Sequence, residues 1–228
     1  MKLFFLPGVP PTLRCTHTKE ALDLVLRTLG VPSVDLLIVA FPGIHFDADD
    51  ESDSDGTPSP HGSPTSSAAP SLAPAAAPVE PTESMARTWR TLEALHAAGQ
   101  VDRLGLSEFG SARLARFLPA TTVRPAVDQI NVRDCCVVPK PLIMFAKREG
   151  IELLTHNDWA DVLPRGTLRE LLGGGEGGMG VLAGPEEQGE GLKGDIEPLW
   201  VIKYTAVVKD RGVVENKGYF AGAELNER

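Results

Sequence analysis

The sequence contains little cysteine, no long hydrophobic run and no surplus of positive charge, and each shortage excludes a class of protein. Three cysteines in 228 residues, two of them adjacent, do not make a disulfide framework, and their spacing does not fit a zinc site. The opening MKLFFLPGVPP has an apolar run of only ~5 residues, whereas a signal peptide needs ~7–15 and a membrane span ~20. We therefore expect a protein of the cytoplasm with no bound metal and no membrane partner.

One segment carries most of the negative charge. Residues 46–84 combine an acidic run with Pro, Ser and Ala, and they contain eight acids and no Lys or Arg. Such a composition cannot bury enough apolar surface to offset its ordering entropy, so it predicts a disordered insert. Without these eight acids the formal charge changes from −9 to −1, which leaves no basic surplus for phosphates and excludes nucleic acid as a partner. The remaining residues are too few for a complete eight-unit β/α barrel, which typically needs ~200–250.

Outside this insert, short apolar strands alternate with amphipathic helices. This repetition predicts a parallel sheet of five or six strands with right-handed crossovers. No GxGxxG follows the first strand, which disfavours a doubly wound dinucleotide-binding fold and leaves a barrel, with residues 1–45 as its first part and 85–228 as the remainder. A Gly/Glu-rich segment at 173–194 is expected to be a flexible loop. The expected strands are 2–6, 34–40, 103–107, 126–132, 151–154 and GVVENKGY near the end, and the expected helices are 19–29, a segment around 89–98, 111–118, 141–149, 167–172 and 196–208.

The ends of the strands are where a β/α barrel keeps its functional residues. The most suggestive of these ends is LLTHND, in which His156 is followed by Asn157 and Asp158. A histidine beside a carboxylate can act as a general base or a metal ligand. The same side chains can also cap the next helix and close the loop. We favour this second interpretation, because no other histidine or nucleophile is nearby in the sequence.

Two further groups of residues allow both a functional and a structural interpretation. The adjacent Cys135 and Cys136 can be redox-sensitive or form a bond to a partner, or one can fill the core while the other lines the rim. The packing interpretation is favoured, since Arg133 is the only nearby cation that would lower a thiol pKa. The second group consists of cations near the C-terminus, Lys209, Arg211 and Lys217. They can hold a phosphate or be solvated charges around a glycine turn, and the sequence leaves both open.

Several motifs together resemble those of a known family. GLSEFG (105–110) resembles the GxSNF segment of aldo-keto reductases, Gln129 stands where their sixth strand has a Gln, and VDLLIVAFP (34–42) is similar to their DLYLIHWP strand. A narrower combination, VDQINVRDCCVVPKPLIMFAKREGIELLTHND with LWVIKYTAVVKDRGVVENKGY, resembles the regulatory subunits of glutamate–cysteine ligases, a non-catalytic branch of that superfamily. The resemblance covers nearly the whole chain except the segments 46–84 and 173–194.

The resemblance implies an α/β fold, an incomplete TIM-type (β/α) barrel that lacks the first two β/α units and carries two disordered inserts. The barrel would be open at the edge of its first strand, or the sequence is a truncated version of a longer chain, which we favour. Active members use an Asp, Tyr, Lys and His tetrad. By alignment Ala40 stands at the histidine, Gly8 stands near the lysine, and the Asp and Tyr would precede Met1. Glu108 replaces the Asn of GxSNF and puts a carboxylate near the nicotinamide amide. We therefore expect no catalysis and no cofactor.

The resemblance also implies a partner. A regulatory subunit of this branch forms a heterodimer with the catalytic subunit of glutamate–cysteine ligase, improves its use of glutamate and relieves feedback inhibition by glutathione. The alternative is an NADP-dependent oxidoreductase of the aldo-keto reductase type. For the docking surface we expect the barrel rim together with the C-terminal segment, that is Cys135, Cys136, His156, Asn157, Asp158, Lys209, Arg211, Lys217 and Tyr219.

Overall fold

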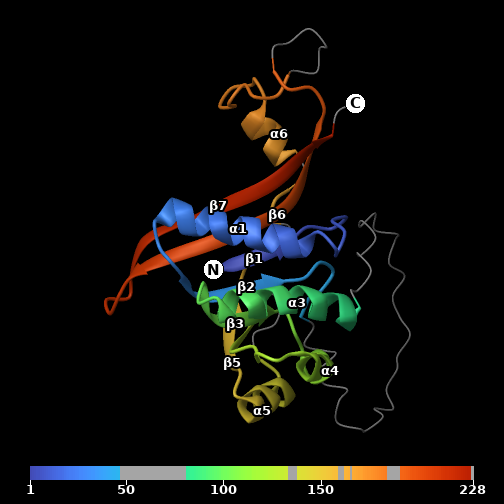
Figure 1. Ribbon diagram of the computed structural model, residues 1–228, viewed down its shortest axis with the longest axis vertical. Coiled ribbons are helices and arrows are strands. Elements are labelled where there is room, and N and C mark those ends of the chain that lie inside the picture. The colour runs from blue at the N-terminus through green and yellow to red at the C-terminus, as the bar shows by residue number, and fades with distance from the viewer. Residues whose placement is uncertain (47–80, 133–137, 159–161, 165, 184–190, 227–228) are drawn as a thin grey trace, which may run out of the picture.

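Seven strands form one open sheet in the order β5-β4-β3-β2-β1-β6-β7 (Figure 1). The computed structural model describes residues 1–46, 81–132, 138–158, 162–164, 166–183 and 191–226. Strands β1 to β5 are parallel, as the alternation of strands and helices predicts, whereas β6 and β7 run antiparallel to their neighbours. The strands are β1 (Lys2–Phe5), β2 (Val34–Ala40), β3 (Val101–Ser107), β4 (Val127–Asn131), β5 (Glu152–His156), β6 (Asp195–Val208) and β7 (Val213–Asn226).

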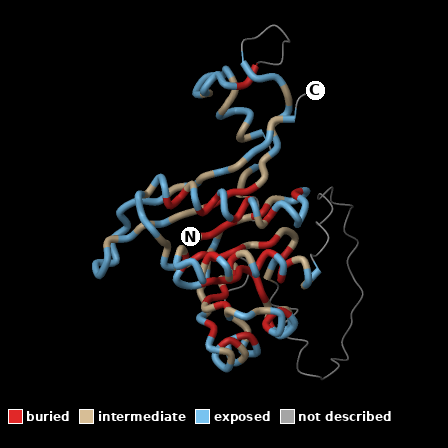
Figure 2. The backbone as a smooth tube through the Cα atoms, in the orientation of Figure 1, coloured by how far each residue is buried: buried red, intermediate tan, exposed pale blue. Residues whose placement is uncertain are grey.

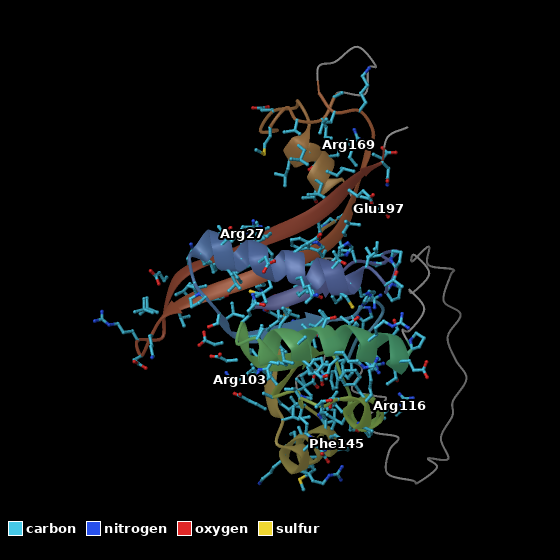
Figure 3. All side chains as sticks on the ribbon, in the orientation of Figure 1. Arg27, Arg103, Arg116, Phe145, Arg169 and Glu197 are labelled. Atoms are coloured by element: carbon cyan, nitrogen blue, oxygen red, sulfur yellow. The ribbon has the colours of Figure 1, made fainter. Side chains whose placement is uncertain are left out.

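The first four of the helices given below cover one face of this sheet and form the core with it (Figure 1). Figure 2 shows the buried residues concentrated between the strands and these helices. At the centre, Trp89 is fully buried, donates from Nε1 to the Val123 carbonyl oxygen at 2.9 Å and packs edge-on against Phe117. Charged side chains such as Arg27 and Arg116 lie at the periphery (Figure 3). The helices are α1 (Arg14–Leu29), α3 (Thr82–Ala97), α4 (Ser111–Phe117), α5 (Lys140–Glu149) and α6 (Thr167–Leu172).

Helix α3 begins inside the segment that composition marks as an insert. Its first residue is Thr82, so the last three residues of 46–84 are helical. Glu83 lies in the first turn, where a negative charge interacts favourably with the helix dipole. Met85 and Trp89 are buried and lie on the apolar face of the helix. Their packing holds the first turn in place, and the composition of the residues before it gives no sign of these contacts. The expected end of the insert at residue 84 is therefore too late.

The largest correction concerns the C-terminal segment. The helix expected over 196–208 is wrong, because residues 195–208 form β6 and pair with β7 in a long antiparallel hairpin. Trp200 and Ile202 join the core and alternate at a period of two with Val201 and Lys203, which point to the other face. The turn between the strands contains Asp210 and Gly212, both at φ 62°, which is the left-handed backbone that hairpin turns require.

This hairpin changes which strands are edges. Strand β6 pairs antiparallel with β1, with Lys2 opposite Lys203 and Phe5 opposite Trp200. The first strand is therefore not an edge of the described sheet, contrary to the expected opening there. The edges are β5 and β7 instead, and the sheet has seven strands rather than five or six. The sheet does not close on itself, as expected for an incomplete barrel.

The Gly/Glu-rich segment lies at the far end of the hairpin, beside α6 (Figure 1). Of residues 173–194, those that the structure describes form hydrogen-bonded turns: the Met179 amide donates to the Leu171 carbonyl, and Leu182 bridges Leu192. Arg169 ties α6 to the start of β6, since Nη2 lies 2.6 Å from the Gly194 carbonyl oxygen and 3.1 Å from Asp195 Oδ1. This end of the molecule is thus joined to the hairpin and lies away from the other helices.

Candidate functional site

The sheet face opposite the helices holds a small cavity of about 190 Å³. Alternation along the strands sends Leu3 and Val39 to the helices, and Lys2 and Ile38 to this open face. Space there is limited: a Cβ at Gly105 would lie 2.9 Å from Ile38 Cγ1, so the GLSEFG motif needs its first glycine for close packing. The lining residues are Met1, Lys2, Ile38, Gln129, Asp158, Lys203 and Thr205.

A hydrogen-bonded pair, Glu108 and His156, joins the ends of two strands beside the cavity. Glu108 directly follows β3 and His156 is the last residue of β5, and His156 Nε2 lies 2.5 Å from Glu108 Oε1. The backbone amide of Asp158 donates to His156 Nδ1 at 3.1 Å, so Nδ1 is an acceptor and Nε2 carries the proton that faces the carboxylate. The second carboxylate oxygen accepts the Phe46 amide at 3.0 Å.

Glu108 adopts a backbone conformation that glutamate rarely takes. Its φ is 67°, in the left-handed region, where an L-residue other than Gly, Asn or Asp costs about 1–2 kcal/mol. The family's GxSNF segment has Asn at this position, and Asn tolerates such a backbone better than Glu does. Hydrogen bonds hold the turn, from the Glu108 amide to the Gln129 carbonyl and from Arg113 Nη1 to the Glu108 carbonyl. The strain is thus maintained by surrounding contacts.

Opposing effects act on the ionisation of Glu108. Burial alone would raise the pKa of this carboxyl group, since the residue is only 9% exposed. The hydrogen bond from His156, the Phe46 amide and the Lys2 ammonium charge lower it, and together they leave the pKa of Glu108 below its usual value. Glu108 is therefore an ionised carboxylate at neutral pH.

Two lysines and Asp158 complete the network. Asp158 Oδ1 lies 2.6 Å from Lys203 Nζ, and Oδ2 lies 3.6 Å from Lys2 Nζ. Burial would raise the pKa of Asp158, but the Lys203 hydrogen bond and the two ammonium charges lower it below its usual value. Lys2 Nζ also lies 3.2 Å from His156 Nε2. Burial lowers the pKa of Lys2 to about 8, against the opposing effects of Asp158 and Glu108.

The arrangement is an amine of lowered pKa beside an imidazole–carboxylate pair. Two ammonium groups balance two carboxylates, so the cluster is internally neutral. Among the described residues, no group of three or more His, Cys, Asp or Glu side chains could hold a metal ion. Gln129 Oε1 is buried and makes no hydrogen bond within the described part of the chain, and it lies in the wall of the cavity. Ser107 Oγ donates to the Gln129 backbone carbonyl at 3.1 Å.

The structure brings together only some of the residues that the sequence singled out. His156 and Asp158 meet in the network. As expected, His156 closes its loop through Nδ1, but its other ring nitrogen reaches Glu108, which local sequence did not indicate. Asn157 is exposed beside them. Lys209, Arg211 and Lys217 lie further along the hairpin, toward its tip. Tyr219 lies opposite Lys203 and interacts with its ammonium group, so it borders the network. Cys135 and Cys136 lie outside the described residues.

Sequence reasoning missed Lys2, Lys203 and the pairing role of Glu108. The only available signal for Glu108 was its departure from the family motif. The signal for Lys2 was the presence of a cation in an otherwise apolar strand. The signal for Lys203 was the period-two alternation of residues 200–203, which the expected helix over 196–208 did not take into account. Within the described residues, no helix has both the length and the apolar character to cross a membrane.

The chain belongs to the aldo/keto reductase family, whose model matches residues 2–167. It is 28% identical over 209 residues to a Mus musculus protein named glutamate–cysteine ligase regulatory subunit, a match that covers 92% of this chain and 61% of the relative. A Schizosaccharomyces pombe protein named as a putative regulatory subunit of the same ligase is 28% identical over 100% of this chain and 71% of its own length. An NAD(P)H-dependent D-xylose reductase from Candida tenuis is 28% identical over 63% of this chain and 40% of the relative. The chain thus spans 61% of the mouse relative's length.

Proposed function

We propose that this chain is a non-catalytic regulatory subunit of glutamate–cysteine ligase, acting in the cytoplasm as a heterodimer with the catalytic subunit. One observation carries the proposal: the match to the named regulatory subunits covers 92–100% of the chain and so extends well past residue 167, where the family model ends. The match to the xylose reductase covers only 63%. Similarity through the β6–β7 hairpin therefore favours the regulatory branch over the enzymes.

Regulation in this proposal works through differential binding. A subunit changes its partner's substrate affinity only if it prefers one of the partner's conformations. Preference for the conformation that binds glutamate well would lower the KM for glutamate and weaken inhibition by glutathione together. A typical coupling free energy of about 1–3 kcal/mol corresponds to a change of about 5- to 150-fold in affinity.

We place the docking surface on the distal half of the β6–β7 hairpin. Strand β7 is an edge of the sheet, and the tip projects beyond α1 in Figure 1. An edge strand offers unpaired backbone groups to a partner. His156 and Asp158 are less suitable, since their side chains are 10% and 18% exposed and engaged in the network. Asn157, Cys135 and Cys136 remain in the proposal as a second contact. The hairpin surface consists of the exposed residues Val207, Lys209, Arg211, Val213, Val214, Lys217 and Tyr219.

The test is titration of the purified chain into a glutamate–cysteine ligase catalytic subunit. We expect co-purification, a lower KM for glutamate and weaker glutathione inhibition. If both kinetic parameters stay unchanged at saturating chain, the regulatory function is wrong.

A pair of variants tests the docking surface separately. Replacing Val213 and Val214 by Thr keeps β-branching but removes exposed apolar surface, and should weaken association by about tenfold. The matched control replaces Ile143 and Met144 on α5, which are similarly exposed, by Thr and Gln and should bind like the parent chain. Equal weakening by both pairs would show that the hairpin is not the docking surface.

The reductase alternative makes a different prediction. It requires saturable binding of NADPH and turnover of a carbonyl compound, which a nucleotide fluorescence titration and a cofactor-oxidation assay would measure. The family match and the xylose reductase match favour this alternative. The hydrogen bond between Glu108 and His156 disfavours it, because it engages the side chain that stands at the Asn position of the GxSNF motif. Absence of NADPH binding would remove this alternative.

A further inference from the structure

We propose that Lys2 is a nucleophilic amine that forms a reversible imine with a small, carboxylate-bearing aldehyde bound in the cavity on the open face of the sheet. This activity is independent of the regulatory function. It rests on a buried amine, a cavity that the amine lines, a second cation in the same cavity and the Asp158 carboxylate beside it, which can move a proton.

The environment of Lys2 is of the kind that activates lysine nucleophiles. The residue is 5% exposed, and its ammonium shares the cavity with that of Lys203. Desolvation and a neighbouring cation both favour the neutral, reactive amine. Asp158 and Glu108 oppose this effect, yet the pKa of Lys2 is still lowered to about 8. At pH 8 about half of Lys2 is neutral, against about 0.3% of a lysine with the usual pKa of 10.5.

The cavity selects the kind of aldehyde. Its volume of about 190 Å³ admits a molecule of only a few heavy atoms. Lys203 has three ammonium donors, of which Asp158 and Tyr219 engage two, so one remains for an anion. A short aldehyde with a carboxylate matches this set.

The reaction balances without any oxidant or reductant. The neutral amine of Lys2 adds to the carbonyl carbon, and the C–O double-bond pair moves to oxygen, which is protonated to a carbinolamine. Asp158 Oδ2, at 3.6 Å, is placed to take the proton released from nitrogen. Asp158 passes this first proton to the alkoxide oxygen and then moves the second N–H proton to the carbinolamine hydroxyl in the same way, while neutral His156 keeps its Nε2 proton hydrogen-bonded to Glu108. Water leaves as the C–N double bond forms, giving imine plus water.

Reductive trapping tests the proposal on the full chain. The probe is glyoxylate with cyanoborohydride, which converts an imine into a stable carboxymethyl-amine that peptide mass spectrometry locates. We expect Lys2 to be modified at least about tenfold faster than Lys147, an exposed lysine on α5, at pH 8. The pH dependence at Lys2 should have its midpoint near 8, whereas that at Lys147 should still rise. This comparison is internal to the parent chain, so it does not depend on a variant folding.

Two variants and a second probe sharpen the outcome. Lys2→Arg should abolish the adduct. Lys203→Gln should slow modification by glyoxylate more than that by uncharged glycolaldehyde, because both lose the cation that lowers the pKa of Lys2 and only glyoxylate also loses its ammonium partner. Fragment spectra must place the adduct on the Lys2 side chain rather than on the adjacent Met1 amine. Equal rates at Lys2 and Lys147, or modification of Met1 alone, would overturn the proposal. Equal slowing of both aldehydes by Lys203→Gln would overturn its anion-binding part.

Discussion

Replacing Glu108 by Asn should destabilise the fold even though Asn suits the backbone better at this position. The substitution restores the family's GxSNF pattern and relieves left-handed strain at φ 67°, a gain of about 1 kcal/mol. It also removes the carboxylate that accepts from His156 at 2.5 Å and from two backbone amides, Phe46 at 3.0 Å and Asn131 at 3.4 Å. Asn is one methylene shorter and cannot reach these donors.

The loss outweighs the gain. A charge-assisted hydrogen bond contributes about 1.5–3 kcal/mol, and each buried donor left without an acceptor costs about 1–3 kcal/mol. With the weak Asn131 contact at the low end and the strain relief subtracted, Glu108→Asn should lower the free energy of unfolding by about 3 kcal/mol at pH 7.5. Glu108→Gln keeps one acceptor oxygen and the length of the side chain, so it should lower this free energy by about half as much.

Urea unfolding followed by tryptophan fluorescence measures these differences. The matched control is Asp210→Asn, because Asp210 is exposed in the hairpin turn at φ 62° and has the same backbone requirement without the network. It should stay within about 0.5 kcal/mol of the parent chain. The pKa of Glu108 is lower in the folded chain than its usual 4.5, so its stabilisation is present above pH 4.5 and is lost as pH falls through the folded value. A Glu108→Asn chain as stable as its parent at pH 7.5 would refute the reasoning.

Three further substitutions test other parts of the structure. Gly222→Ala places a Cβ against the Trp200 indole and should destabilise the hairpin by about 2 kcal/mol, whereas Gly174→Ala has open space and should be neutral by thermal unfolding. Asp128 is fully buried, and burial raises its pKa well above 3.8, so the parent chain should lose stability as pH rises from about 4. Asp128→Asn should flatten this pH dependence of the free energy of unfolding. An unchanged slope between pH 4 and 7.5 in denaturation experiments would contradict this. Burial lowers the pKa of Lys2 to about 8, against 10.5 in an unfolded chain, so the folded state binds fewer protons between these two pH values. Stability should therefore rise over this pH range by at most about 3 kcal/mol. Lys2→Met should abolish the rise, and a rise that persists in the variant would rule out Lys2 as its source.

The sequence predicts the parallel part of the sheet because its signals are local. A continuous apolar run at 34–40 and alternating strands and helices from 103 to 154 depend only on neighbouring residues, and the structure places β2 to β5 there within a few residues. Family membership follows from the same short motifs, GLSEFG and the strand that ends at Pro42. The prediction that the acidic segment is an insert is local in the same way, because it depends only on the composition of that segment.

Only the tertiary structure decided the position of the C-terminal hairpin and the network on the open face. Residues 196–208 are apolar enough for either a helix or a strand, and the outcome depends on β1 offering an unpaired edge that an antiparallel strand can cover. The contact between Lys2 and His156 joins residues 154 positions apart, and Glu108 lies between them in the chain. Which side chains share the open face is set by strand register, and a slip of one residue would turn Lys2 or Lys203 toward the helices. Register is a property of paired strands, so no single segment of the sequence contains it.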